Sequence, residues 1–164
     1  LRLQESLHDL PATELDTEKR RKVEAWLDAG YGACVLRTPA IARIVQDSLL
    51  FHHAQRYELH AWVVMPNHVH VLLHSLDGWT MAKIVGTWKK FTARRILELC
   101  PRETLSPKRE QPVWHREYWD RFVRNEEHYA RVVDYIEQNP VKAGLVVHAE
   151  EWPWGSAYAR NPQR

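Results

Sequence analysis

The sequence predicts an α+β fold in which helices pack on a small, mainly antiparallel sheet. Residues 57–65 are β-rich and alternate between apolar and polar side chains, and a second strand is expected at residues 68–74. Only Pro66 and Asn67 separate the two strands, and so short a link predicts an antiparallel hairpin. Helical segments lie on both sides of it. We therefore expect residues 1–164 to form a single domain.

Two helices are predicted before the hairpin. Residues 15–30 have Thr17 as a candidate cap and end at Gly30, which is a typical helix stop. Residues 38–56 have Thr38 as a candidate cap and a proline in the first turn, where its missing N–H is no loss. Both segments are thus expected to pack against the sheet as helices.

Two further helices are predicted after the hairpin. Residues 80–100 form a long helical segment in spite of one internal glycine. Residues 125–140 begin with Asn125 as the cap and carry two glutamates in the first turn, where they suit the helix dipole. Pro140 is expected to end this helix.

The remaining segments give weaker signals. Residues 1–7 alternate like an edge strand, and because the chain starts without methionine we expect the beginning of this strand to be cut. Residues 101–113 contain three prolines and are predicted to be a mobile loop. Residues 113–124 are ambiguous, partly extended and partly turn. Residues 151–164 form a C-terminal extension with two prolines and a basic end.

Composition excludes several classes of protein. Hydrophobic residues make up 45% of the chain and charged residues 27%, which is typical of a globular domain and not of a disordered one. The formal net charge of +2 is too small to identify a partner. The two cysteines lack CxxC spacing and indicate neither a disulfide framework nor a zinc knuckle. With no membrane-span or signal-peptide pattern, we expect a protein of the reducing cytoplasm.

Two histidines stand one residue apart in the apolar stretch MPNHVHVLLH. On a strand, residues i and i+2 point to the same face, so His68 and His70 present two imidazoles side by side while Val69 and Val71 point into the core. Two convergent nitrogen ligands are a good half of a divalent metal site. For an isolated HxH pattern, two histidines on a solvated sheet face would be the simpler interpretation.

The wider sequence around these histidines resembles a known family. WVVMPNHVHVLL resembles the HUH motif of single-tyrosine transposases, in which two histidines flank a bulky apolar residue. AWVVMPNHVH, followed by YIEQNPVKAGLV and EWPWGSA, is similar in content and order to the REP-associated tyrosine transposases, relatives of bacterial insertion-sequence transposases. The likeness extends from about Leu1 to Ala157. It implies a ferredoxin-like, RRM-like HUH domain with His68 and His70 on a central strand.

Helical geometry distinguishes the candidate tyrosines of residues 125–140. Tyr129 begins an apolar series at i, i+3, i+4 and i+7, which predicts a core aromatic. Tyr135 lies beside that series, anchored yet open to a substrate, with Asn139 one turn later. The Asn139 carbonyl oxygen could complete a metal shell begun by His68 and His70.

The family resemblance points to the same two residues. It implies that Tyr135 is the nucleophile and Asn139 the third metal ligand, where related insertion-sequence enzymes carry glutamine. For an isolated helix, Tyr135 would be a half-buried structural aromatic and Asn139 a C-terminal cap before Pro140. Tyr118, in EYWDRF, is the alternative nucleophile, although packing or base stacking is the simpler interpretation of its surroundings.

The resemblance also implies the reaction. Mg²⁺ or Mn²⁺ would polarise a scissile phosphate, and Tyr135 would attack it to give a 5′-phosphotyrosine on single-stranded DNA near a hairpin. The expected activity is therefore DNA nicking and joining by transesterification, in a monomer or a homodimer. Two alternatives remain at this point: a domesticated hairpin-binding protein without turnover, and a metal-dependent phosphodiesterase in which water attacks.

Two groups of residues are candidates for DNA binding. Lys83, Lys90 and Arg94 fall on one face of the predicted helix 80–100, here called the basic stripe, which suits a phosphate backbone. An ordinary solvated helix face is the simpler alternative. The second group interleaves arginines with aromatic residues, as suits unstacked bases. It consists of Arg116, Trp119, Arg121 and Arg124.

Overall fold

The structure of the chain is a computed structural model that describes residues 18, 22, 25–27, 34–100, 113–115, 118 and 122–161. Its elements are, in order, η1 (Val35–Arg37), α2 (Pro39–Phe51), β1 (Tyr57–Val64), β2 (Val69–Ser75), α3 (Met81–Leu99), α5 (Glu126–Glu137), α6 (Asn139–Lys142), η2 (Ala149–Glu151) and α7 (Ser156–Arg160). Residues 18, 22 and 25–27 are also helical, within the predicted first helix. The predicted strand 1–7 and the loop 101–112 lie outside the described residues. None of the helices in the described ranges is long and apolar enough to cross a membrane.

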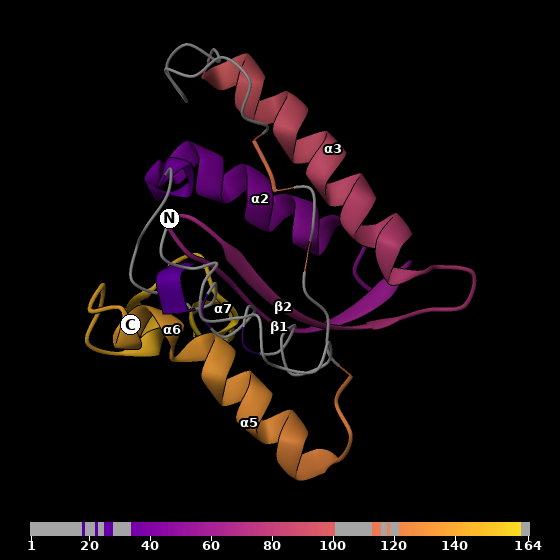
Figure 1. Cartoon of the computed structure of the whole chain (residues 1–164), viewed down its shortest axis with the longest axis vertical. Coiled ribbons are helices and arrows are strands. Elements are labelled where there is room, and N and C mark those ends of the chain that lie inside the picture. Colours follow the sequence, from indigo (N-terminus) through magenta and orange to yellow (C-terminus); the bar gives the residue numbers. More distant parts are fainter. Residues whose placement is uncertain are drawn as a thin grey trace.

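The antiparallel hairpin of β1 and β2 lies between two helical layers (Figure 1). Helices α2 and α3 pack against each other on one face, and α5 packs on the other. The larger core cluster joins apolar residues of α2 and α3 to the first face, with Val45, Val64 and Ile84 among them. The smaller one joins Ile136 of α5 to the second face. The predicted α+β fold is confirmed.

A β-bulge at His60 decides which residues of β1 face α5. The strand pairing shifts between Leu59 and Ala61, so β1 has one extra residue at this point. Leu59 belongs to the core cluster of α2 and α3, whereas Ala61 and Val63 belong to the α5 cluster. Side chains alternate along a strand, so without the bulge Leu59, Ala61 and Val63 would all face the same core. The bulge thus places Val63 on the α5 side, where its strand partner His70 also lies.

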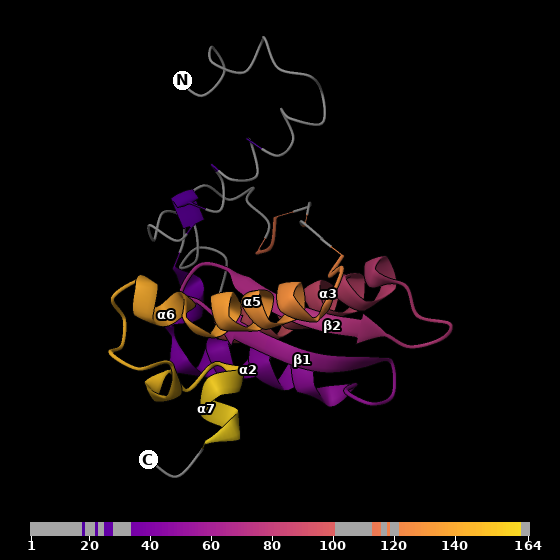
Figure 2. The same cartoon turned by 90° about the horizontal axis from the view of Figure 1, so that it is seen from below.

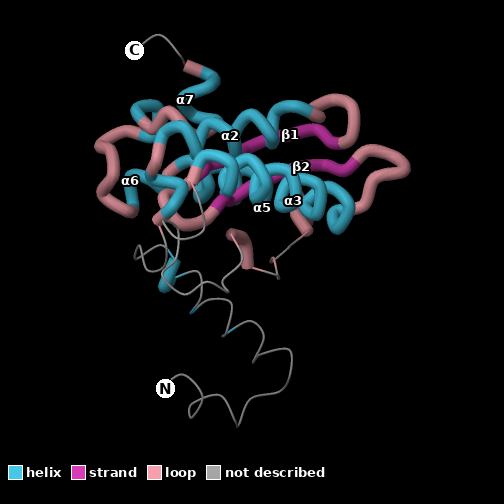
Figure 3. The backbone as a smooth tube through the Cα atoms, turned by 90° about the horizontal axis from the view of Figure 1, so that it is seen from above, coloured by secondary structure: helices cyan, strands magenta, loops and turns pink. Residues whose placement is uncertain are grey.

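The C-terminal segment covers the outer edge of β1, opposite β2 (Figures 2 and 3). The Val64 N–H donates to the Trp154 carbonyl at 2.8 Å, and the Trp62 N–H donates to the Ser156 hydroxyl at 3.2 Å. A Cβ on Gly155 would lie 3.4 Å from the Trp62 carbonyl oxygen, so the backbones approach closely here. An uncovered strand edge is prone to pair with other chains. The EWPWGSA motif therefore has a structural role as the cover of this edge.

Helix α2 is shorter than the predicted helix 38–56. It ends at Phe51, and the chain then turns through residues 52–56, where Ala54 has a φ of 62°. His53 stabilises this turn because its Nδ1 accepts a hydrogen bond of 3.0 Å from the Leu59 N–H. The reversal is needed to bring the chain back into β1, and the prediction of five more helical residues was wrong.

The helix predicted at 125–140 is divided in two. Asn125 is the N-cap of α5 and accepts from the His128 N–H at 2.8 Å, as predicted. Helix α5 ends at Glu137, and Asn139 opens the short helix α6. Pro140 therefore stands in the first turn of α6, where its missing N–H is tolerated, and does not itself end α5.

Candidate active site

His70 lies on β2, whereas His68, which was predicted to be in the strand, directly precedes its first residue, Val69. His68 closes the turn after β1, because the Met65 N–H donates to the His68 carbonyl at 2.9 Å. The His68 side chain is buried, and Val69 packs against the α2–α3 core. His70 follows on β2, and the Nε2 atoms of the two histidines are 3.0 Å apart. The imidazoles thus lie side by side, as strand alternation predicts.

This separation fits two ligands of one divalent cation. Ligands about 2.1 Å from a cation and at right angles to each other are about 3.0 Å apart. The Nε2 atoms of His68 and His70 match that distance. In the described part of the chain no group of three or more His, Cys, Asp and Glu side chains could hold a metal, so a further ligand from these described residues would be of another type.

Asn139 is the candidate for that further ligand. Its side chain is only 2% exposed, and its Nδ2 is a buried atom without a hydrogen-bond partner among the described residues. Buried polar groups are nearly always satisfied, so an orphaned amide suggests a missing partner. Which end of an amide carries oxygen is an assignment, so this end could present its carbonyl oxygen to a cation. Imidazole nitrogens and an amide oxygen are donor types that Mn²⁺ accepts, and an amide oxygen also suits Mg²⁺.

Tyr135 lies on α5, beside the histidine pair. Its ring packs against the core cluster that contains Ile136, which anchors the side chain. The ring centroids of Tyr135 and His70 are 5.4 Å apart, at an interplanar angle of 73°. On another side, the Lys142 Nζ lies 5.0 Å from the Tyr135 ring centroid. The phenol thus has an imidazole and a cation as neighbours.

The other two candidate tyrosines lie elsewhere. Tyr129 was predicted to be a core aromatic, but it is 38% exposed, so this prediction was wrong. Its ring meets His60 at the β-bulge, and its hydroxyl is 3.3 Å from the His60 Nδ1. Tyr118 lies against Lys89 of α3, with the Nζ 5.5 Å from the ring centroid. Tyr118 is thus next to a helix on the opposite side of the sheet from α5.

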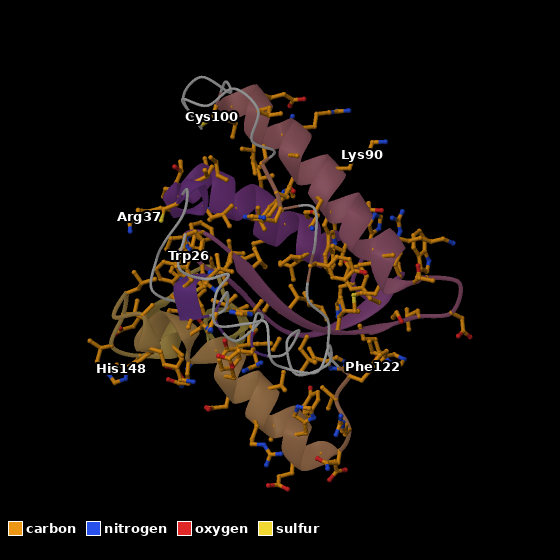
Figure 4. The ribbon with its side chains drawn as sticks, viewed as in Figure 1. Trp26, Arg37, Lys90, Cys100, Phe122 and His148 are labelled. Carbon is orange, nitrogen blue, oxygen red and sulfur yellow. The ribbon has the colours of Figure 1, made fainter. Side chains whose placement is uncertain are left out.

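The predicted DNA-binding residues are divided between two faces. The basic stripe is exposed on the outer side of α3, and Lys90 points away from the sheet (Figure 4). Arg94 also forms an ion pair of 3.3 Å with Glu98, one helical turn later, which partly neutralises this end of the stripe. Arg124 is exposed just before α5. Arg116, Trp119 and Arg121 lie outside the described residues.

Asn67 and Lys142 contact residues of this site, and Glu137 follows on α5, but none of the three was predicted to have a role. Asn67 bridges His68 and the Leu27 carbonyl, Lys142 lies over Tyr135, and Glu137 accepts a hydrogen bond of 2.6 Å from the Ser156 hydroxyl. Asn67 and Lys142 stand inside the quoted motifs MPNHVH and NPVKAGLV, so proximity to the candidate ligands was a usable signal. For Glu137 the sequence contains no signal, because its partner belongs to a distant segment.

Fold and site together define an α+β domain whose sheet presents paired histidines to a tyrosine on a packed helix. The chain belongs to the IS200-like transposase family, because the sequence profile described as "Transposase IS200 like" matches residues 42–139.

Relatives of this chain point to one group within that family. The "REP-associated tyrosine transposase" of Escherichia coli strain K12 is 28% identical over 104 residues, covering 61% of this chain and 54% of the relative. A relative from Haemophilus influenzae is 30% identical over 104 residues, covering 61% of this chain and 58% of its own length. The chain thus spans little more than half of these relatives.

A solved structure agrees with both comparisons. It is described as "Structure of the REP associates tyrosine transposase bound to a REP hairpin". The likeness has a TM-score of 0.58 at 25% identity and covers 77% of this chain and 70% of the other. The resemblance to REP-associated tyrosine transposases drawn from the sequence motifs is therefore confirmed.

Proposed function

We propose that this chain nicks and rejoins single-stranded DNA by transesterification, as a metal-dependent transposase that acts on hairpin DNA of the REP type. The observation that carries the proposal is the position of the Tyr135 ring, 5.4 Å from the His70 ring on the face where the two histidines converge. A weak nucleophile such as a phenol needs groups nearby that stabilise charge on the phosphate. The α5 packing supplies this proximity.

Tyr135 is the proposed nucleophile. Its phenolic oxygen attacks the phosphorus of a phosphodiester, a new phosphorus–oxygen bond forms on the 5′ side, and the bond to the 3′ oxygen breaks. The phenol gives up its proton, and the departing oxygen ends as a 3′-hydroxyl. Because the phosphotyrosine conserves the phosphodiester energy, attack by a 3′-hydroxyl rejoins a strand without ATP.

His68, His70 and Asn139 are the proposed ligands of Mg²⁺ or Mn²⁺, through two imidazole nitrogens and one amide oxygen. The bound ion would supply charge stabilisation at the scissile phosphate. The imidazoles favour Mn²⁺, which accepts nitrogen ligands more readily than Mg²⁺ does. Support for this assignment comes from the Nε2 separation of 3.0 Å and from the unsatisfied Asn139 amide.

The proposed DNA partner follows from the solved relative, which is bound to a REP hairpin. Lys142 and Arg124 are exposed cations at opposite ends of the α5–α6 segment that bears Tyr135, and both suit contacts to a phosphate backbone. The basic stripe of α3 lies on the other side of the sheet, so its proposed role is a separate contact with the hairpin or its flanks.

A covalent-trapping experiment tests the proposal. The protein is incubated with Mn²⁺ and a hairpin oligonucleotide whose single-stranded flanks come from repeats near its gene. The label is at the 3′ end, because that fragment stays attached to a 5′-phosphotyrosine. We expect a detergent-resistant adduct with the wild type and with Tyr129→Phe, and none with Tyr135→Phe.

Two results would contradict the proposal. Cleavage that survives in Tyr135→Phe would indicate a phosphodiesterase that uses water. Hairpin binding by the wild type without any cleavage, with Mg²⁺ or Mn²⁺, would indicate a binding protein without turnover.

A further inference from the structure

We infer that Asn67 is a positioning residue, which fixes the proton of neutral His68 on Nδ1 and thereby points the Nε2 lone pair at His70. The inference deepens the proposed function, because it concerns how the proposed ligand pair is kept ready to bind a cation. It depends on three hydrogen-bonding contacts that run from the N-terminal helical residues to the histidine pair.

The first contact determines which way the Asn67 amide points. Asn67 Nδ2 lies 2.8 Å from the Leu27 carbonyl oxygen, which can only accept a hydrogen bond. The amide end that faces Leu27 must therefore be the NH₂ group. The opposite orientation would bring two oxygen acceptors together without a proton between them.

The second contact then determines the tautomer of His68. With its NH₂ group turned to Leu27, Asn67 presents Oδ1 to the His68 Nδ1 at 2.7 Å. Oδ1 is an acceptor, so Nδ1 must carry the proton. A neutral imidazole has only one N–H, and the His68 Nε2 is therefore the nitrogen with the lone pair.

The third contact shows where that lone pair points. His68 Nε2 faces the His70 Nε2 at 3.0 Å, the spacing of two adjacent ligand atoms on one cation. A metal-binding histidine commonly donates its other ring N–H to an oxygen acceptor, which fixes the ring and increases its basicity as a ligand. Asn67 is in the position to do this for His68.

The turn that carries Asn67 is itself fixed by backbone hydrogen bonds. The Met65 N–H donates to the His68 carbonyl at 2.9 Å, and the Leu36 N–H donates to the Pro66 carbonyl at 3.0 Å. These two hydrogen bonds fix the backbone on both sides of Asn67, and His68 lies buried beside it. Loss of the Asn67 side chain would leave the backbone of the turn in place. It would remove the Oδ1 acceptor that keeps the proton of His68 on Nδ1.

Nuclear magnetic resonance of nitrogen-15-labelled histidines in metal-free protein tests the inference at pH 8, above the ordinary titration range of imidazole. We expect His68 of the wild type to be protonated on Nδ1. Asn67→Ala should shift His68 toward the other tautomer, because the Oδ1 acceptor that faces Nδ1 is then lost. Asn161→Ala, at an exposed position after α7, is the control and should match the wild type.

A calorimetric titration with Mn²⁺ supplies the second readout. We expect the affinity of Asn67→Ala to fall by about 10- to 100-fold, the usual effect of removing the partner of a metal-binding histidine. Protonation of wild-type His68 on Nε2, or an unchanged tautomer and Mn²⁺ affinity in Asn67→Ala, would overturn the inference. Failure of the wild type to bind Mn²⁺ would instead contradict the proposed function, and the tautomer would still decide the role of Asn67.

Discussion

Tyr135 lies edge-on to His70, with the ring centroids 5.4 Å apart, although the two residues belong to α5 and to β2. The contact exists because Ile136, the next residue of α5, packs into the core cluster on that face of the sheet. The same burial that stabilises the helix therefore sets the distance between the proposed nucleophile and the proposed ligands. Core packing of α5 and the proposed chemistry at Tyr135 are therefore coupled.

Replacement of His70 by alanine should weaken Mn²⁺ binding more than about 100-fold. Loss of an outer partner of a ligand already costs about 10- to 100-fold, and His70→Ala removes one of the two converging Nε2 atoms themselves. Calorimetric titration measures the effect. His74→Ala, on the same strand but exposed, is the matched control and should bind Mn²⁺ like the wild type. Equal affinities for the two variants would argue against a metal site at the histidine pair.

Replacement of Lys142 by glutamine should slow the formation of the covalent adduct about two- to fivefold. An exposed cation over an aromatic ring contributes about 0.5–1 kcal/mol, which corresponds to that change in rate. Lys142→Arg should restore most of the rate, because it keeps the charge. Arg56→Gln removes a cation that lies 4.2 Å from the Trp79 ring centroid, and this control should leave the rate unchanged. A wild-type rate in Lys142→Gln would exclude a role for this charge.

Replacement of Ser156 by alanine should lower the free energy of unfolding by about 1–3 kcal/mol, the usual cost of leaving a buried group unsatisfied. The Ser156 hydroxyl accepts from the Trp62 N–H at 3.2 Å and donates to the Glu137 carboxylate at 2.6 Å. Urea denaturation measures the change. Ser75→Ala, at the far end of β2, should stay within about 0.5 kcal/mol of the wild type. Similar losses of unfolding free energy in both variants would mean that the hydrogen bonds of Ser156 at the edge of β1 do not account for the effect.

Replacement of Glu151 by glutamine should make stability less dependent on pH. The backbone N–H groups of His148 and Val147 donate to the Glu151 carboxylate and hold its pKa below the ordinary value. A lowered folded-state pKa adds stability above the unfolded-state pKa, and this stability is lost as the pH falls through the folded-state value. Glu151→Gln should therefore be less stable than the wild type in urea at pH 7, with a smaller difference at pH 3. A stability difference between the two proteins that is larger at pH 3 than at pH 7 would contradict a lowered pKa of Glu151 in the folded state.

The hairpin and the long helix could be predicted because their signals are local. The predicted strands 57–65 and 68–74 differ from β1 and β2 by one residue at each altered end, and the predicted helix 80–100 exceeds α3 by one residue at each end. Alternation, a tight Pro-Asn turn and an apolar helical face are properties of neighbouring residues. The same alternation correctly placed the imidazoles of His68 and His70 side by side.

Features that depend on distant segments could not be predicted. Tyr129 follows the apolar spacing of α5, but the surface below it is His60 at a bulge, which no local pattern indicates. Helices η2 and α7 form where the C-terminal segment meets the edge of β1, and the short, proline-containing sequence gave no helical signal. The partner of Asn67 is the Leu27 carbonyl, a backbone atom that any residue could supply.

The central claim is that DNA becomes attached to the phenol of Tyr135, and mass spectrometry of the trapped adduct tests it most directly. After nuclease digestion, trypsin cleavage behind Arg131 and Lys142 releases residues 132–142, in which Tyr135 is the only tyrosine. Tyr129 falls in the preceding peptide, so the two sites are separated by mass. We predict a nucleotide phosphate on Tyr135 in the peptide 132–142. Attachment to the peptide with Tyr129 or Tyr118, or DNA cleavage without any modified peptide, would contradict the account.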